Sequence, residues 1–338
     1  MNRAMQYQQG SLKISAMIAP DVTEEYLTVL EQLGVNYGYT WVEDDQCTVE
    51  FIRRHKERLA AHGITLYNVA NLTLGKSADI HLALPGREER IHQYIAFLRT
   101  LSECDIHTTT ITWEPNGTLS TSPVTGKVTY DPEATTRGGA KARTIDMDVM
   151  NRMPYSHGRS YSKQETWDNF TYFVQKVIPA AEEYQVRISL HPNDPPVDSV
   201  AGIATLIQNA EDYRRAFEIA NSDFFGMEFC CGCWLEGGAD FGNLTENFRE
   251  FVEKNKVFIV HFRNVTCPLP KFNETFLDDG YGDMKSIMKT ILDTGYSGTI
   301  TLDHTPVMND LGGGDQCALA IATAYAVGYL KALVQALK

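Results

Sequence analysis

The sequence predicts an α/β protein built as a (β/α)8 TIM barrel with a long insertion after the fourth strand. Short apolar runs rich in β-branched and aromatic residues recur eight times, and most are followed by a stretch with helical periodicity. The length of 338 residues and the hydrophobic content of 43% suit one elaborated barrel rather than two domains. We therefore expect a single domain over residues 1–338.

The eight strands are expected where the β-forming runs lie. Their ranges are 12–19, 35–41, 64–70, 106–113, 186–191, 225–230, 257–262 and 298–304. Eight is the number of strands that closes a TIM barrel, and in this fold the carboxyl ends of all strands open onto one face.

The helices are expected between these strands. Acidic residues in the segment that begins at Asp21 suit the positive end of a helix dipole, and Gly34 and Gly63 stand where helices end in a left-handed residue. All but the last helix link consecutive strands, as parallel pairing requires. Their ranges are 21–34, 47–62, 87–104, 163–184, 198–220, 244–255, 283–294 and 315–337.

The interval 114–161 breaks this alternation. It is rich in Gly, Thr, Ser, Pro, Asp and Arg, and it contains Arg137-Gly-Gly-Ala-Lys-Ala-Arg143 and His157-Gly-Arg159. Loops of this length within a compact domain are usually functional or disordered. Since it follows the fourth strand, we interpret it as a lid over the active site, with a mobile surface insertion as the alternative.

Composition excludes several classes of function. A formal net charge of -13 opposes binding to nucleic acids. The first residues lack the apolar core of a signal peptide, and no stretch is expected to span a membrane. The seven cysteines, three of them in Cys230-Cys231-Gly232-Cys233, do not form a disulfide framework, and we interpret them as thiols rather than a metal cluster. A cytoplasmic protein with a small-molecule partner is expected, and a homo-oligomer is left open.

Potential metal ligands stand at the ends of four consecutive predicted strands. These residues are His191, Cys230, His261 and Asp303. Because the strand ends of a barrel converge on one pocket, they are expected to meet around a single divalent ion. Two imidazoles, a thiolate and a carboxylate are compatible with Mn(II), Fe(II), Co(II) or Zn(II), and the residues alone leave that choice open.

At this point the chain resembles the mannonate dehydratase family of xylose-isomerase-like barrels, and the resemblance covers most of the sequence. The matching segments, in family order, are His81-Leu-Ala-Leu-Pro-Gly-Arg87, His191-Pro-Asn-Asp-Pro-Pro196, Phe229-Cys230-x-Gly232, His261-x-Arg263-Asn264-Val265, Phe272-x-Glu274, Gly280-x-x-Asp283-Met284 and Asp303-His304. The resemblance implies a metal-dependent hydro-lyase that converts D-mannonate or a related aldonate to 2-keto-3-deoxy-D-gluconate with Mn(II) or Fe(II). It also implies the four ligands named above and a catalytic role for His304.

Two segments depart from the family pattern. Leu277-Asp-Asp-Gly-Tyr-Gly-Asp-Met284 lacks a family histidine, and Gly314-Asp315-Gln316-Cys317-Ala318 stands where the family has a Gly-Tyr-Pro segment with a second acid/base tyrosine. Tyr281, Asp283 or His157 could replace that tyrosine. A different but related sugar acid would be consistent with these changes.

Further site residues are predicted around this core. Arg263 is expected to stabilise oxyanion charge as a catalytic group, together with His304 and Tyr281. Trp113 could stack on a sugar or simply pack, and Glu228 could assist or replace a metal ligand. Residues expected to bind substrate are Asn264, Trp113, Glu114, Arg87, His157 and Arg159, with surface salt bridges as the alternative for the two arginines.

Two other functions remain open at this stage. A metal-dependent sugar isomerase, epimerase or keto-sugar lyase would use the same ligands, because these enzymes also stabilise an enediolate and move protons at carbon. A non-catalytic sugar-binding barrel would explain the missing histidine and tyrosine.

Overall fold

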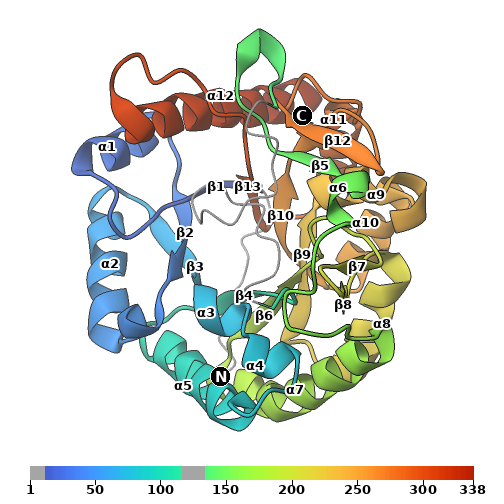
Figure 1. Ribbon diagram of the computed structural model, residues 1–338. Coiled ribbons are helices and arrows are strands. Elements are labelled where there is room, and N and C mark those ends of the chain that lie inside the picture. Colours follow the sequence, from blue (N-terminus) through green and yellow to red (C-terminus); the bar gives the residue numbers. More distant parts are fainter. Residues whose placement is uncertain (1–11, 116–133) are drawn as a thin grey trace.

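A barrel of eight parallel strands forms the centre of the computed structural model, which describes residues 12–115 and 134–338 (Figure 1). The order around the sheet is β3-β2-β1-β13-β10-β9-β6-β4, and an Asn68–Thr110 side-chain hydrogen bond of 2.9 Å joins β3 to β4. The predicted TIM barrel is thus confirmed. The strands are β1 (Lys13–Met17), β2 (Tyr37–Val42), β3 (Thr65–Asn71), β4 (Thr108–Thr112), β6 (Arg187–His191), β9 (Phe225–Cys230), β10 (Val257–Phe262) and β13 (Thr299–Leu302).

Eight longer helices surround this barrel, as Figure 1 shows. Thr23 and Thr48 cap the first two by accepting hydrogen bonds from backbone amides, and Ser162 with Glu165 forms a capping box before α7. Apolar side chains such as Leu27, Phe170 and Ile259 fill the interior and are completely buried. The helices are α1 (Glu24–Gln32), α2 (Val49–Ala61), α5 (Arg87–Glu103), α7 (Lys163–Tyr184), α8 (Ala210–Ala220), α10 (Leu244–Glu253), α11 (Met284–Asp293) and α12 (Gly314–Leu337).

The predicted helix 198–220 is wrong in its first half. A small hairpin of β7 (Ser199–Val200) and β8 (Ile203–Ala204) occupies this part, and α8 begins only after its cap Asn209. Ala201 and Gly202 have positive φ angles of 47° and 86°, which a right-handed helix does not accommodate. The hairpin turn therefore excludes a helix before residue 210.

Three further helices between strands, two of four residues and one of 11, were not predicted. They are α3 (Leu72–Gly75), α4 (Ala78–His81) and α9 (Cys231–Phe241). The α9 sequence contains three glycines and is apolar over its whole first half, so it shows no amphipathic periodicity. Its formation depends instead on Cys230, whose side chain accepts a hydrogen bond from the Cys233 amide at the helix start.

The insertion after β4 contains secondary structure in the part that the structure describes. It includes the 3-10 turn η3 (Arg137–Gly139), β5 (Thr144–Asp146) and α6 (Met147–Met150), whereas residues 116–133 of the predicted lid lie outside the described residues. β5 pairs antiparallel with β12 (Lys271–Thr275), which also pairs with β11 (Asn264–Val265). Figure 1 shows β5 and β12 beside each other at the rim of the barrel. This small sheet fixes residues 143–146 next to the segment that follows β10.

Helix α12 corrects the expectation that no segment is apolar enough to cross a membrane. It has 24 residues and a mean hydropathy of 1.7 in its most apolar window, of which 28% is buried. In the fold it contacts α1, α11, β1 and β13. It therefore occupies the position of the eighth barrel helix, which accounts for its apolar composition.

Candidate metal centre and active site

Four potential ligands converge at the carboxyl ends of neighbouring strands. His191, Cys230 and His261 belong to β6, β9 and β10, and Asp303 directly follows β13. One ligand atom from each residue lies within 4.8 Å of the corresponding atoms of the other three. Ligands about 2.0–2.3 Å from a common ion are separated by up to about 4.6 Å, so the spacing suits a single metal ion. The structure thus brings together all four residues of the predicted ligand set.

The local contacts of His191 and Cys230 suit both residues to bind a metal ion. His191 Nδ1 lies 2.7 Å from the carbonyl oxygen of Pro192; when it donates there, Nε2 keeps its lone pair for an ion. Burial opposes ionisation of Cys230, but Cys233, the Arg263 guanidinium and His191 hold the pKa of its thiol well below the usual range. Cys230 is therefore a thiolate, the form in which cysteine binds metals.

The two ring nitrogens of His261 give the most direct test of whether a metal ion fits this site. Its ring lies 2.5 Å from a Glu228 oxygen and 3.2 Å from an Asp303 oxygen, yet neither buried ring nitrogen has a partner with hydrogen-bond geometry. Buried nitrogens without such partners are rare in folded proteins. An imidazole nitrogen that coordinates an ion satisfies this position, and Glu228 lies where it can orient the ring.

The charges of these four side chains also favour the binding of a cation. Burial opposes ionisation of Asp303, but His304, His261 and Arg263 hold the pKa of its carboxyl well below the usual range. Although burial disfavours the charged form of His191, the Cys230 thiolate raises the pKa of that imidazole to about 9. Protons on the imidazoles thus balance a thiolate and a carboxylate, and a divalent ion would replace these protons upon binding.

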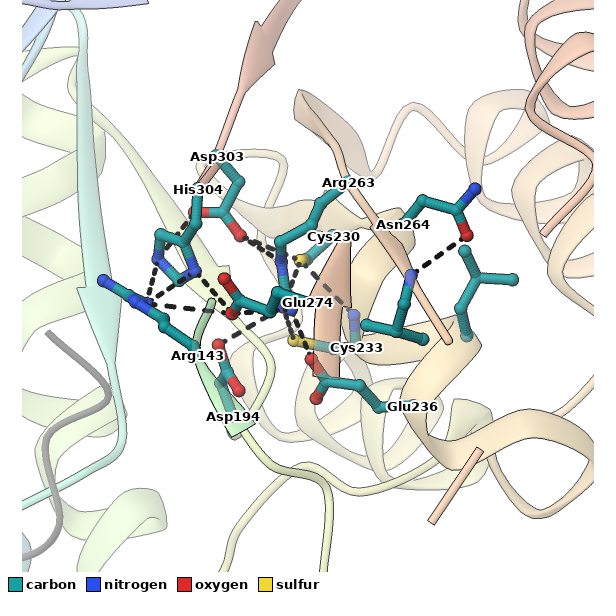
Figure 2. Close-up of polar contacts among 12 residues, drawn as sticks. Arg143, Asp194, Cys230, Cys233, Glu236, Arg263, Asn264, Glu274, Asp303 and His304 are labelled. Carbon is teal, nitrogen blue, oxygen red and sulfur yellow. Dashed lines mark hydrogen bonds and ion pairs between the residues drawn. The ribbon is translucent and has the colours of Figure 1, made fainter. Parts of the chain in front are cut away.

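A second layer is built around Arg263, which is completely buried and lies beside Cys230 and Asp303 (Figure 2). Its Nε donates to Asp303 at 2.9 Å, which orients that carboxylate from behind. The guanidinium is also paired with three further acidic groups, at distances of 2.5–3.3 Å: Asp194, Glu236 and Glu274. The Arg263 side chain has no accessible surface, and its four acidic partners occupy the guanidinium; its role toward a reacting oxyanion stays a prediction.

His304 lies between Glu274 and Arg143 at the edge of the metal group (Figure 2). Its Nδ1 is 3.0 Å from Glu274 Oε1, and Arg143 Nη1 lies 2.6 Å from Nδ1 and 2.8 Å from Nε2. If Nδ1 carries the hydrogen and donates to Glu274, Nε2 keeps its lone pair. Burial opposes ionisation of Glu274, but His304, Arg263 and Arg143 lower the pKa of its carboxyl to about 2, so it remains an acceptor.

We predict that Arg143→Ala lowers kcat by roughly tenfold without loss of metal. The reason is that one charge-assisted hydrogen bond to His304, worth on the order of 1.5 kcal/mol, would be removed. Steady-state kinetics with metal analysis would measure this. Arg137→Ala is the matched control, since Arg137 belongs to the same insertion but pairs with Asp278 at the surface, at 2.9 Å. Equal activities of the two variants would contradict a role for Arg143 at this site.

Asn264 and Tyr281 have structural contacts that do not match their predicted roles. Asn264 is buried and donates to the carbonyls of Leu277 and Gly282, at 3.1 and 3.2 Å, while its own oxygen accepts from two backbone amides. The Tyr281 hydroxyl donates to the carbonyl of Leu235. These bonds hold the segment after β12 in place, and the predicted roles of both residues toward substrate stay predictions.

The remaining predicted residues make their contacts with groups other than the four proposed ligands. Trp113 is buried and stacks on His81 with ring centroids 3.9 Å apart, so packing accounts for it. Glu114 pairs with Lys76 at 3.0 Å and accepts from the Asp194 amide, which holds the loop after β6. Arg87 forms a surface ion pair with Glu88, and Arg159 forms one with Glu165. His157 contacts the neighbouring Ser156.

Sequence reasoning assigned no role to Arg143, Asp194 or Glu274, which lie at this site. The ligand atoms of Asp194, Glu274 and His304 lie within 4.8 Å of one another. All three stand in segments with a sequence signal: Asp194 follows His191-Pro-Asn, Glu274 ends Phe272-x-Glu274, and Arg143 ends the Arg137–Arg143 run of the insertion. Arg143 had a weaker signal, because only the pairing of β5 with β12 brings it to the site.

Comparison with known proteins gives the chain a family match. The family model for D-mannonate dehydratase (UxuA) matches residues 29–338. Among curated relatives, mannonate dehydratase 2 of Halalkalibacterium halodurans is 26% identical over 275 residues, which cover 74% of this chain and 76% of that protein. The mannonate dehydratase of Oceanobacillus iheyensis is 28% identical over 291 residues, covering 80% and 79%.

Solved structures share the fold. The crystal structure of mannonate dehydratase from Streptococcus suis serotype 2 superimposes with a TM-score of 0.80 at 21% identity and covers 97% of this chain and 95% of its own. D-Psicose 3-epimerase from Clostridium cellulolyticum, solved with D-tagatose, gives a TM-score of 0.61 at 14% identity, with 94% and 99% covered. At these identities the likeness establishes the fold of this chain as a xylose-isomerase-like barrel.

Proposed function

The chain belongs to the D-mannonate dehydratase family, a family of hydro-lyases, and on that premise we propose that it removes water from D-mannonate to give 2-keto-3-deoxy-D-gluconate. The observation that carries the proposal is the juxtaposition of the four-ligand group His191, Cys230, His261 and Asp303 with His304. A metal group beside an imidazole combines charge stabilisation with proton transfer, the two things that elimination next to a carboxylate requires.

The proton that leaves carbon 2 of the aldonate is assigned to His304. In the arrangement described above, its Nδ1–H donates to Glu274, so Nε2 carries the lone pair that accepts a proton. Glu274 fixes this tautomer and favours the imidazolium ion that forms. Arg143 Nη1, which lies 2.6 and 2.8 Å from the two nitrogens of the same imidazole, helps to hold the ring in place before substrate is bound.

His191, Cys230, His261 and Asp303 are the residues proposed to hold the metal. The bound ion would act as a Lewis acid that stabilises negative charge on substrate oxygens. We propose Mn(II) or Fe(II), as in the family resemblance, with Zn(II) and Co(II) as the alternatives that the mixed ligand set also accepts. All seven cysteines lie in the described residues and are free thiols, which supports a reducing, cytoplasmic location.

The test is an assay of purified protein that has been stripped with a chelator and reloaded with Mn(II), Fe(II), Zn(II) or Co(II) separately. We expect D-mannonate to give a 2-keto acid, detected by semicarbazone absorbance, with the highest rate in Mn(II) or Fe(II) and none in the stripped protein. D-Gluconate and D-tagatose, run in parallel, test related substrates. The proposal fails if D-mannonate is unchanged, and epimerised ketose as the only product would favour an isomerase or epimerase instead.

A further inference from the structure

Elimination of water needs a second group that assists the departing hydroxyl, and the residues predicted for this role are engaged elsewhere. The Tyr281 hydroxyl donates to the Leu235 carbonyl, and Asp283 caps α11 through its hydrogen bonds to Ser286. His157 pairs with its neighbour Ser156. These contacts hold the three side chains to residues outside the metal group.

Tyr39 of β2, which received no role from the sequence, does reach that group. Its ring centroid lies 6.2 Å from that of His261, with 35° between the ring planes. The side chain faces the barrel interior, because the preceding Gly38 faces outward toward Ile18 and Ile64 and neighbouring residues of a strand alternate in direction. Tyr39 therefore approaches the metal group from a strand that supplies none of the proposed ligands.

The hydroxyl of Tyr39 stands out by its lack of a partner. The residue is only 6% exposed, yet its hydroxyl makes no hydrogen bond within residues 12–115 and 134–338. The nearby Tyr67 differs, since its hydroxyl lies 3.4 Å from Ser15 Oγ and is held in the barrel. A hydroxyl beside an active site that makes no bond to these residues is available to a ligand.

The charge state of Tyr39 suits a hydrogen-bond donor. The phenol of tyrosine has a pKa of about 10 in water. The phenol thus keeps its hydrogen near neutral pH. A neutral phenol can donate to an oxygen on which negative charge develops, and such donors act most strongly where water is excluded.

We propose that Tyr39 contacts the substrate and donates a hydrogen bond to the hydroxyl oxygen that departs, from a different strand than His304. This inference rests on the proposed dehydratase function. It assigns the hydroxyl-assisting role to β2, whereas in the family resemblance a tyrosine after the last strand fills it, where this chain reads Gly314-Asp315-Gln316.

The test compares Tyr39→Phe with Tyr37→Phe, which makes the same change two residues earlier on β2, toward the amino end of the barrel. We expect Tyr39→Phe to lower kcat/KM for D-mannonate by roughly 10- to 100-fold, the loss that follows from one hydrogen bond to a developing charge. Metal content and Tm should stay at the wild-type values. Tyr37→Phe should remain within about twofold of wild type in the same assay.

A measurement of substrate binding distinguishes failure of this inference from failure of the proposed dehydratase function. Calorimetric titration of D-mannonate into metal-loaded His304→Ala protein, with and without Tyr39→Phe, measures contact without turnover. A Kd weakened by about tenfold would support the contact even if the wild-type enzyme proved inactive on D-mannonate, in which case only the proposed function would fail. Wild-type kinetics and an unchanged Kd in Tyr39→Phe would overturn the assignment of Tyr39 while leaving the dehydratase function intact.

Discussion

His261→Gln should leave the barrel folded, without stoichiometric metal, and with kcat for D-mannonate reduced by roughly a thousandfold or more. Glutamine keeps most of the side-chain volume but removes the imidazole, whose two buried nitrogens lie near Glu228 and Asp303 without hydrogen-bond geometry to any residue in 12–115 or 134–338. Loss of the ion removes an electrostatic contribution of several kcal/mol to transition-state stabilisation, and each 1.36 kcal/mol corresponds to about a factor of ten in rate. Elemental analysis after dialysis, with steady-state kinetics, measures both effects.

His92→Ala is the control for that experiment. His92 lies on the exposed face of α5, so its removal should change neither metal content nor rate. Circular dichroism and Tm of both variants establish that the fold is intact. Full metal occupancy and normal turnover of His261→Gln would show that His261 is not a ligand.

His304→Ala is the second change with a large expected effect, and it should separate catalysis from metal binding. We expect kcat to fall by roughly 10²- to 10⁴-fold, the usual contribution of a general acid or base, while one metal ion per chain is retained. Its imidazole contacts Glu274 and Arg143, and the side chain is 23% exposed, so truncation leaves little packing to lose. Single-turnover kinetics of the metal-loaded variant would check the chemical step.

Two outcomes of that experiment are informative. Glu274→Gln should share part of the defect, because the amide no longer stabilises an imidazolium ion, and it serves as a graded comparison. If His304→Ala keeps both metal and full turnover, proton transfer at carbon 2 must be assigned to another group.

Much of the fold and the centre of the site follow from local patterns in the sequence. The β-forming runs and the glycines that end helices locate the eight strands, and β9 and β10 have the predicted bounds. Once the barrel is assumed, the positions of His191, Cys230, His261 and Asp303 at successive strand ends determine that they meet, because closure of the sheet brings these ends together.

The parts that the sequence did not predict depend on tertiary contacts. Arg263 follows a strand just as an active-site residue would, but only the arrangement of Glu236, Glu274 and Asp303 around it shows that it is buried. Arg143 reaches His304 through pairing of β5 with a strand 125 residues further on, between Asp146 and Lys271, for which no sequence period exists. The sequence does not distinguish Tyr39 from other inward-facing barrel residues, and only the structure shows that its ring lies beside His261.

A crystal of the Mn(II)-loaded protein measured for anomalous scattering tests the central claim most directly. The account predicts one anomalous peak per chain, within coordination distance of His191, Cys230, His261 and Asp303 together. A peak bound instead by Asp194, Glu274 and His304 would contradict it. The absence of a peak from protein that contains one Mn(II) per chain would contradict it as well.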